Sequence, residues 1–151
     1  MVGFILIVAC LSGCVARYSM FKEYADCETV YLNGTEAEAR NALIAFLSNA
    51  EKNMETMLKD PDSVPPNERM NYSLVLGDSW LRLATIYRFE HDSGNYDRAM
   101  ARAIHYYDNV KVPDMASNPR YTTNKEASLL DSLEQLEAVN RPKWRTKKRQ
   151  P

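Results

Sequence analysis

The sequence predicts an all-helical fold of about five helices. Apolar residues recur three and four positions apart over most of the chain, and no segment alternates polar and apolar residues as a half-buried strand would. Only five of the 151 residues are glycine, whereas a β-rich chain with many tight turns would need more. Hydrophobic residues make up 45% and charged residues 26% of the chain, which is typical of one folded domain.

Two helices are expected in the first half of the chain. The first spans residues 18–32 and is interrupted at Gly34. Thr35 and Glu38 then have the spacing of a capping box, in which the hydroxyl and the carboxylate each bind the other residue's backbone amide. The helix that begins there is expected to run to Leu58, just before an Asp-Pro pair.

Three further helices are expected, over residues 68–91, 96–110 and 124–139. Gly77 lies inside the first of them, where glycine costs about 1 kcal/mol relative to alanine. Its presence therefore predicts a close approach of a neighbouring helix at that point. A second candidate capping box, Thr123 to Glu126, precedes the last helix.

The N-terminus reads as a targeting segment. Residues 4–11 are all apolar, but this run is shorter than the roughly 20 residues that a membrane-spanning helix needs. It is similar to the hydrophobic part of a signal peptide. The run ends in Leu11-Ser12-Gly13-Cys14, which resembles the bacterial lipoprotein box, a branched residue, two small residues and a cysteine.

The lipoprotein resemblance implies that residues 1–13 are removed and that Cys14 carries diacylglyceryl and acyl lipid, with residues 14–17 as a tether. The residue after the cysteine is Val15 and not the aspartate that retains enteric lipoproteins in the inner membrane. By this analogy the protein faces the periplasm from the outer membrane. The alternative is an ordinary signal peptide followed by a chance cysteine. Once Cys10 is removed and Cys14 lipidated, Cys27 is alone and is expected to be buried.

One stretch resembles a tetratricopeptide repeat. The matching positions are Trp80, Leu83, Ala84, Tyr87, Ala99 and Pro113. In that family such residues pack the first helix of a hairpin against the second. Ala84 stands where glycine is usual, and Tyr87 and Ala99 lie three residues further apart than in the family. The resemblance implies a divergent helical hairpin.

The first half of the domain is predicted to repeat the second with an offset of 60 residues. The pairs are Asn33 with Ser93, Gly34 with Gly94, Ala39 with Ala99, Ile44 with Ile104, and Phe46 with Tyr106. Residues 18–140 would then form two tetratricopeptide-like hairpins closed by a C-terminal capping helix, as a helical solenoid requires for solubility. The alternative is a helical bundle without repeats.

No catalytic or metal-binding constellation is found in the sequence, so no enzyme activity, metal or cofactor beyond the lipid is predicted. The chain has only two histidines, His91 and His105, and they do not form a ligand pair at metal-binding spacing. There is no Gly-x-Ser-x-Gly motif and no phosphate-binding glycine loop. Residues 90–92 are interpreted as a structural cluster at a helix end. Glu51 and Glu55 are interpreted as part of a solvated face.

Aromatic and arginine residues gather around the second predicted hairpin. The candidate partner-binding residues are Tyr87, Arg88, Tyr96, Arg98, Arg102 and Tyr106. Aromatic and arginine side chains dominate many protein–protein interfaces, so a peptide-binding groove is one interpretation. The other is that the aromatics belong to the core and the arginines are solvated.

The charge distribution is asymmetric. Residues 14–140 carry 13 basic and 20 acidic side chains, whereas residues 141–151 carry six basic and no acidic ones. This basic tail is expected to be disordered and able to contact an anionic surface. Nucleic-acid binding is not expected of an exported protein.

Together these features predict a lipid-anchored scaffold or adaptor that mediates protein–protein interaction in an envelope assembly. The alternative function is a periplasmic binding protein for a small ligand or cell-wall fragment in a helical pocket. The sequence does not identify the partner.

Overall fold

The protein is all-helical, as predicted. The structure is a computed structural model that describes residues 20–59, 64–109 and 124–147. These ranges contain six helices and no strand. They are the helix over residues 20–33, α2 (Glu36–Leu58), α3 (Pro66–Phe89), α4 (Ser93–Asn109), α7 (Lys125–Val139) and α8 (Lys143–Lys147). The predicted signal peptide, Cys14 and Pro113 lie outside the described residues. Within these ranges, no helix has the length and apolar character needed to cross a bilayer.

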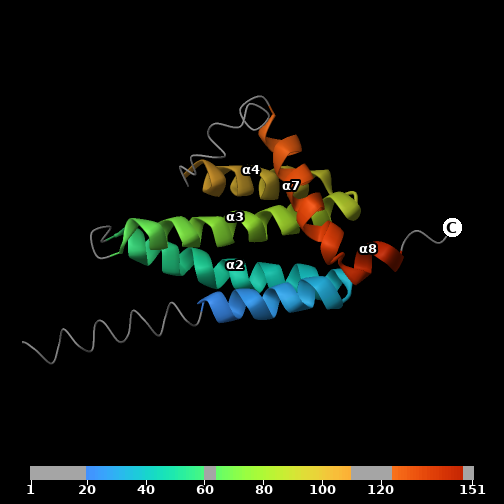
Figure 1. Cartoon of the computed structure of the whole chain (residues 1–151), viewed down its shortest axis with the longest axis horizontal. Helices are drawn as coiled ribbons and strands as arrows, with labels where there is room; N and C mark the ends of the chain where they lie inside the picture. The colour runs from blue at the N-terminus through green and yellow to red at the C-terminus, as the bar shows by residue number, and fades with distance from the viewer. Residues whose placement is uncertain (1–19, 60–63, 110–123, 148–151) are drawn as a thin grey trace, which may run out of the picture.

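The first four helices lie side by side, and each runs antiparallel to the one before it (Figure 1). The helix over residues 20–33 and α2 form one hairpin, and α3 and α4 form a second. α7 crosses α3 and α4 near the turn that joins them, and α8 lies at the same end of the molecule (Figure 1). The expected two hairpins and closing helix are therefore present, with one additional short helix.

The turn of the first hairpin contains the predicted capping box. The Glu38 amide donates to Thr35 Oγ1 at 3.3 Å, and the Thr35 amide donates to Glu38 Oε2 at 2.7 Å. The hydrogen bonds from the Thr35 backbone and hydroxyl hold the pKa of Glu38 below its ordinary value. This local signal alone fixes the start of α2.

The turn of the second hairpin is shorter than the sequence predicted. The Asp92 amide donates to Tyr87 O at 2.9 Å and the His91 amide to Arg88 O at 3.3 Å, which is a Schellman motif. Asp92 then caps α4 by accepting the Asn95 amide at 3.1 Å. Because Asp92 supplies this cap, α4 begins at residue 93, three residues earlier than expected.

His91 occupies the left-handed position of this turn, with φ 62°. A non-glycine residue there costs about 1–2 kcal/mol. Glycine avoids this cost, but its greater conformational entropy in the unfolded chain offsets part of the gain. We expect His91→Gly to raise the free energy of unfolding by about 0.5–1 kcal/mol in urea denaturation followed by circular dichroism. His91→Ala, which keeps the side-chain penalty, should give no gain. A loss of stability in His91→Gly would contradict this assignment.

Gly77 marks the close approach of two helices, as predicted. It is buried in α3, and a Cβ atom at this position would lie 3.1 Å from ring carbons of Tyr107 on α4. A side chain at position 77 would require the Tyr107 ring to shift, so glycine permits this close approach of α4 to α3 at a cost in helix propensity.

The start of α7 differs from the predicted capping box. Asn124 is the N-cap, and its side chain accepts the Ala127 amide at 3.0 Å. Glu126, the expected reciprocal partner of Thr123, instead accepts the Tyr96 hydroxyl. Asparagine is as good a cap as threonine, so the helix begins one residue later and Glu126 becomes available to link α7 to α4.

The hydrophobic core has two parts. One lies mainly between the first hairpin and α3, the other lies among α3, α4 and α7, and Trp80 and Tyr87 pack against both. Three pairs of buried residues lie 60 positions apart in α2 and α4. They are Ala39 and Ala99, Leu43 and Ala103, and Phe46 and Tyr106. The predicted pair of Ile44 and Ile104 is not buried in this way, because Ile44 is 44% exposed. The glycines at this offset are not equivalent, because Gly34 precedes α2 whereas Gly94 lies inside α4. Cys27 is buried as expected, and burial raises the pKa of its thiol to about 11.

The expected disorder of the basic tail is wrong for residues 141–147. Residues 143–147 form α8, and Trp144 is only 3% exposed. Its indole contacts the Tyr31 ring and the Phe89 ring edge-on, and its Nε1 donates to Tyr31 O at 2.9 Å. Trp144 thus packs this segment against both hairpins. The charge composition of the tail does not predict this contact. Residues 148–151 lie outside the described ranges.

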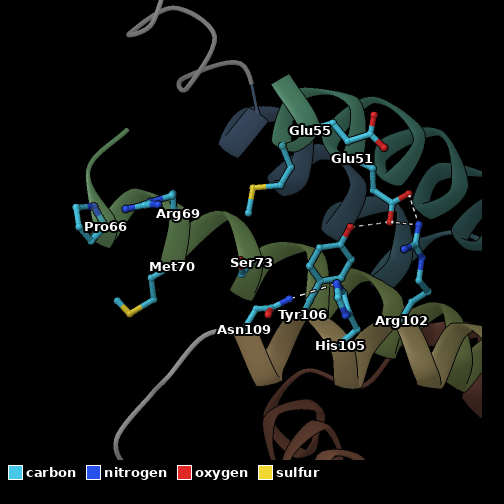
Figure 2. Close-up of a pocket in the computed structure, with 11 residues that line it drawn as sticks. Glu51, Glu55, Pro66, Arg69, Met70, Ser73, Arg102, His105, Tyr106 and Asn109 are labelled. Carbon is cyan, nitrogen blue, oxygen red and sulfur yellow. Dashed lines mark hydrogen bonds and ion pairs between the residues drawn. The ribbon is translucent and has the colours of Figure 1, made fainter. Parts of the chain in front are cut away.

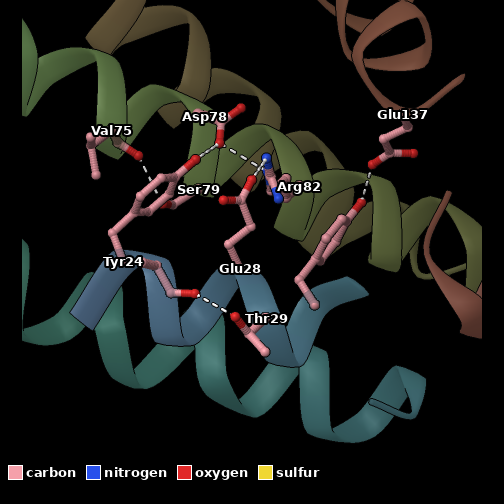
Figure 3. A network of polar contacts seen from close by, with 10 residues as sticks. Tyr24, Glu28, Thr29, Val75, Asp78, Ser79, Arg82 and Glu137 are labelled. Carbon is pink, nitrogen blue, oxygen red and sulfur yellow. Dashed lines mark hydrogen bonds and ion pairs between the residues drawn. The ribbon is translucent and has the colours of Figure 1, made fainter. Parts of the chain in front are cut away.

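A buried arginine links the two hairpins at the interface between the helix 20–33 and α3 (Figure 3). Arg82 is 3% exposed, pairs with Glu28 at 2.7 Å and has its Nε 2.9 Å from Asp78 Oδ2. Asp78 also accepts the Tyr24 hydroxyl. Burial alone would lower the pKa of Arg82, but the nearby Asp78, Tyr24 and Glu28 raise it, so the guanidinium stays charged.

The same arginine reaches the C-terminal segment through Tyr31. Its guanidinium carbon lies 4.9 Å from the centroid of the Tyr31 ring. The Tyr31 hydroxyl donates to Glu137 at 2.5 Å, and Glu137 pairs with Arg145 at 2.6 Å. A continuous chain of polar contacts therefore runs from α3 to α7 and α8 through one tyrosine.

Candidate functional site

A cavity of about 640 Å³ lies between α2, α3 and α4 (Figure 2). It is bounded by the C-terminal half of α2, the N-terminal part of α3 and the C-terminal half of α4. Its lining mixes charged, aromatic and methionine side chains. The lining residues are Glu51, Met54, Glu55, Pro66, Arg69, Met70, Ser73, Arg102, His105, Tyr106 and Asn109.

Glu51 organises one wall of this cavity. Its carboxylate accepts the Tyr106 hydroxyl at 2.9 Å and the Trp80 indole N–H at 2.9 Å, and pairs with Arg102 at 3.2 Å. The Arg102 guanidinium also lies 5.7 Å from the centroid of the Trp80 ring. Burial, and then the hydrogen bond to Glu51, raises the pKa of Tyr106 well above its ordinary value. The wall is therefore held in place by contacts among α2, α3 and α4.

Two methionine side chains form the apolar and adaptable part of the lining. They are Met54, which is buried and follows Glu51 by about one turn on α2, and Met70 on α3, which is 39% exposed. Methionine side chains are flexible and polarizable, so they adjust to the shape of a bound group. Arg69 stands beside them and forms no ion pair with any described residue. This part of the lining therefore offers an apolar surface next to a cation that is not ion-paired with any described residue.

The six predicted partner-binding residues do not form one groove. Arg102 and Tyr106 line the α2–α3–α4 cavity, whereas Arg88 lines a second cavity beside α7 and α8. Tyr87 is half-buried and packs against both parts of the core. The Tyr96 hydroxyl donates to Glu126 on α7. Burial, and then this hydrogen bond, raises the pKa of Tyr96 to about 12. Arg98 is exposed and binds Gly94 O on its own helix at 3.2 Å.

Three residues of the cavity were missed or misread in the sequence. Glu51 was placed on a solvated face, but its side chain is 20% exposed and accepts three donors from other helices. Arg69 and Met70 carry no motif, and only the packing of α3 against α2 and α4 brings them to the cavity. Glu55, one turn after Glu51, is exposed as expected.

The described residues contain no group of three or more histidine, cysteine, aspartate or glutamate side chains placed to hold a metal ion. His91 is exposed at the α3–α4 turn, and His105 lies 3.2 Å from Asn109 Nδ2. The expected structural role of residues 90–92 is seen in the caps that Glu90 and Asp92 provide and in an ion pair between Glu90 and Arg40. The α2–α3–α4 cavity thus combines fixed polar groups with flexible apolar side chains.

Comparison with protein-family models, with characterised proteins and with solved structures finds no match to this chain. Any function must therefore be argued from its own residues.

Proposed function

We propose that the protein is a lipid-anchored adaptor of the bacterial cell envelope that binds a segment of a partner protein in the α2–α3–α4 cavity. The observation that carries this proposal is that the cavity lining combines fixed polar groups with adaptable apolar ones. Glu51 fixes the polar groups, and Met54 on α2 and Met70 on α3 supply the apolar ones, with Arg69 next to Met70. Recognition of a protein segment needs apolar anchors together with polar groups that fix its direction.

The arrangement of the helices supports the same proposal. Two successive antiparallel hairpins with buried residues at a constant spacing are what divergent tetratricopeptide-like repeats would give. Stacked hairpins leave grooves between neighbouring helices, and grooves of this kind accept amphipathic segments. The partner segment proposed here carries apolar side chains that contact Met54 and Met70 and a carboxylate that pairs with Arg69.

Site-specific crosslinking in the native cell tests the proposal. A photoreactive amino acid at position 70 should capture one partner protein, identified by mass spectrometry, because Met70 lies in the cavity. The same amino acid at the exposed Gln135 of α7 is the control and should not capture it. Equal capture from both positions would contradict recognition in this cavity.

Reversing the charge at Arg69 should weaken the partner complex. We expect Arg69→Glu to reduce affinity by about tenfold or more, since a hydrogen bond to a charged group contributes about 1.5–3 kcal/mol. Arg98→Glu makes the same charge change on the exposed face of α4 and is the matched control. Affinity is measured with the crosslinked partner after purification, and an equal loss in both variants would exclude a specific role for Arg69.

The lipid anchor is tested separately. Metabolic labelling with a palmitate analogue should label the wild-type protein, and Cys14→Ser should abolish the label and release the protein from the membrane fraction. Cys27→Ser should keep the label, because Cys27 is a buried core residue. An unlabelled wild type would refute lipidation.

A second candidate function is a binding protein for a small ligand. The cavity volume of about 640 Å³ favours it, because it lies in the range of small-molecule sites. A rise in melting temperature with a cell-wall fragment, in the absence of any protein partner, would support this function over the first.

A further inference from the structure

A second cavity, of about 670 Å³, lies at the end of the molecule where α7 and α8 pack. It is bounded by the last turns of α3, by α7 and by the segment that leads into α8. Its lining residues are Thr85, Arg88, Phe89, His91, Leu130, Leu133, Glu134, Arg141, Arg145 and Thr146. Three arginines thus meet one carboxylate in a domain whose residues 14–140 are acidic overall.

The three arginines differ in their partners. Arg145 pairs with the buried Glu137 at 2.6 Å, so its charge is matched within the fold. Arg88 and Arg141 are exposed and form no ion pair with any described residue. A cation in the last turn of a helix is favoured by the helix dipole, which accounts for Arg88 alone. The dipole of α3 does not explain why Arg141, from a segment more than fifty residues away, lines the same cavity.

The remaining lining is apolar. Leu130 and Leu133 come from α7, and the Phe89 ring packs edge-on against Trp144 at a centroid distance of 5.3 Å. Leu133 is 3% exposed and belongs to the core. Guanidinium groups bind phosphate and carboxylate through paired N–H donors. The cavity therefore joins an apolar surface to two guanidinium groups that form no ion pair with any described residue, although Glu134 also lines it.

We propose that this cavity binds an anionic amphiphile, whose phosphate or carboxylate pairs with Arg88 and Arg141 and whose apolar part lies over Phe89 and Leu130. A phospholipid that leaves a bilayer and a free amphiphilic acid share this chemistry. This site is distinct from the α2–α3–α4 cavity, so its ligand does not depend on the partner proposed above.

The test is titration calorimetry of the purified chain with dihexanoyl phosphatidylglycerol, used below its critical micelle concentration. Dihexanoyl phosphatidylcholine, inorganic phosphate and phosphatidylglycerol vesicles are the comparison ligands. We expect saturable binding of the monomeric anionic lipid, and affinity at least about tenfold weaker for the zwitterionic lipid and for phosphate alone. Higher salt should weaken the anionic complex.

The double variant Arg88→Gln/Arg141→Gln should lower affinity for the anionic lipid by about tenfold or more. Lys52→Gln/Arg98→Gln removes two exposed cations elsewhere and should leave it unchanged. All four substitutions are at exposed positions, so only small decreases in melting temperature are expected, and folding is checked first. Binding to vesicles only, equal affinity for phosphate, or equal losses in both double variants would each overturn the proposal.

Discussion

Replacing Trp144 with alanine is expected to lower the free energy of unfolding by about 3–5 kcal/mol, the usual cost of removing a fully buried large aromatic side chain. The indole packs edge-on against Tyr31 and Phe89, which belong to the first and the second hairpin. Its loss opens a void between the hairpins and removes the attachment of α8. Urea denaturation followed by circular dichroism measures this change.

A milder change at the same position separates packing from hydrogen bonding. Trp144→Phe keeps an aromatic ring but leaves Tyr31 O without the donor that now lies 2.9 Å away. This variant should lose less stability than Trp144→Ala. We expect a loss of about 1–3 kcal/mol, caused by the unsatisfied buried carbonyl and the smaller ring. A loss below 1 kcal/mol in Trp144→Ala would show that α8 is not docked in solution.

The helices could be predicted because their signals are local. A capping box at Thr35 and Glu38, apolar spacing of three and four residues, and a glycine at position 77 each act within a few residues. Some boundaries were wrong. α3 begins and ends two residues earlier than expected. The starts of α4 and α7 depend on which polar residue supplies the cap, which is Asp92 for α4 and Asn124 for α7. That choice is decided by the geometry of the preceding turn.

The docking of the tail could not be predicted from composition. Six basic residues among eleven are typical of a disordered segment. Trp144 reverses this expectation only because Tyr31, more than a hundred residues earlier, offers a ring and a carbonyl at the right place. Arg145 is likewise compensated by Glu137, which the sequence shows only as one acidic residue of an amphipathic helix.

The candidate site was predicted in part for the same reason. Arg102 and Tyr106 stood out as aromatic and arginine residues on one helix, and they do line the α2–α3–α4 cavity. Glu51, which orients both, lies on a different helix, and no pattern in the sequence pairs these positions. Tyr96 and Arg98 share the composition of a binding surface, but the structure gives them contacts to α7 and to their own helix.

Arg82 links the two hairpins although no sequence pattern predicts this role. It lies in the middle of α3 among apolar residues, and nothing in the sequence distinguishes it from a solvated arginine. In the fold its charge is opposed by Asp78 and Glu28 and rests on the face of the Tyr31 ring. The two hairpins therefore share an ion-paired contact in addition to their apolar one.

Substitution of Arg82 by methionine, which has a similar length and no charge, is expected to lower the free energy of unfolding by about 3 kcal/mol. Removing one partner of a buried ion pair costs about 3–5 kcal/mol, and the lower end applies because Glu28 is 38% exposed and retains access to water. Asp78, with 19% exposure, bears most of the loss.

A double variant tests whether this cost comes from the uncompensated charge. In Arg82→Met/Asp78→Asn the amide oxygen still accepts the Tyr24 hydroxyl, but the buried negative charge is gone. If the stranded carboxylate causes the destabilisation, the double variant is more stable than Arg82→Met, by about 1–3 kcal/mol, although Asp78→Asn alone destabilises the wild type. Strictly additive losses in urea denaturation would mean that Arg82 acts through packing against Tyr31 and not through its ion pairs.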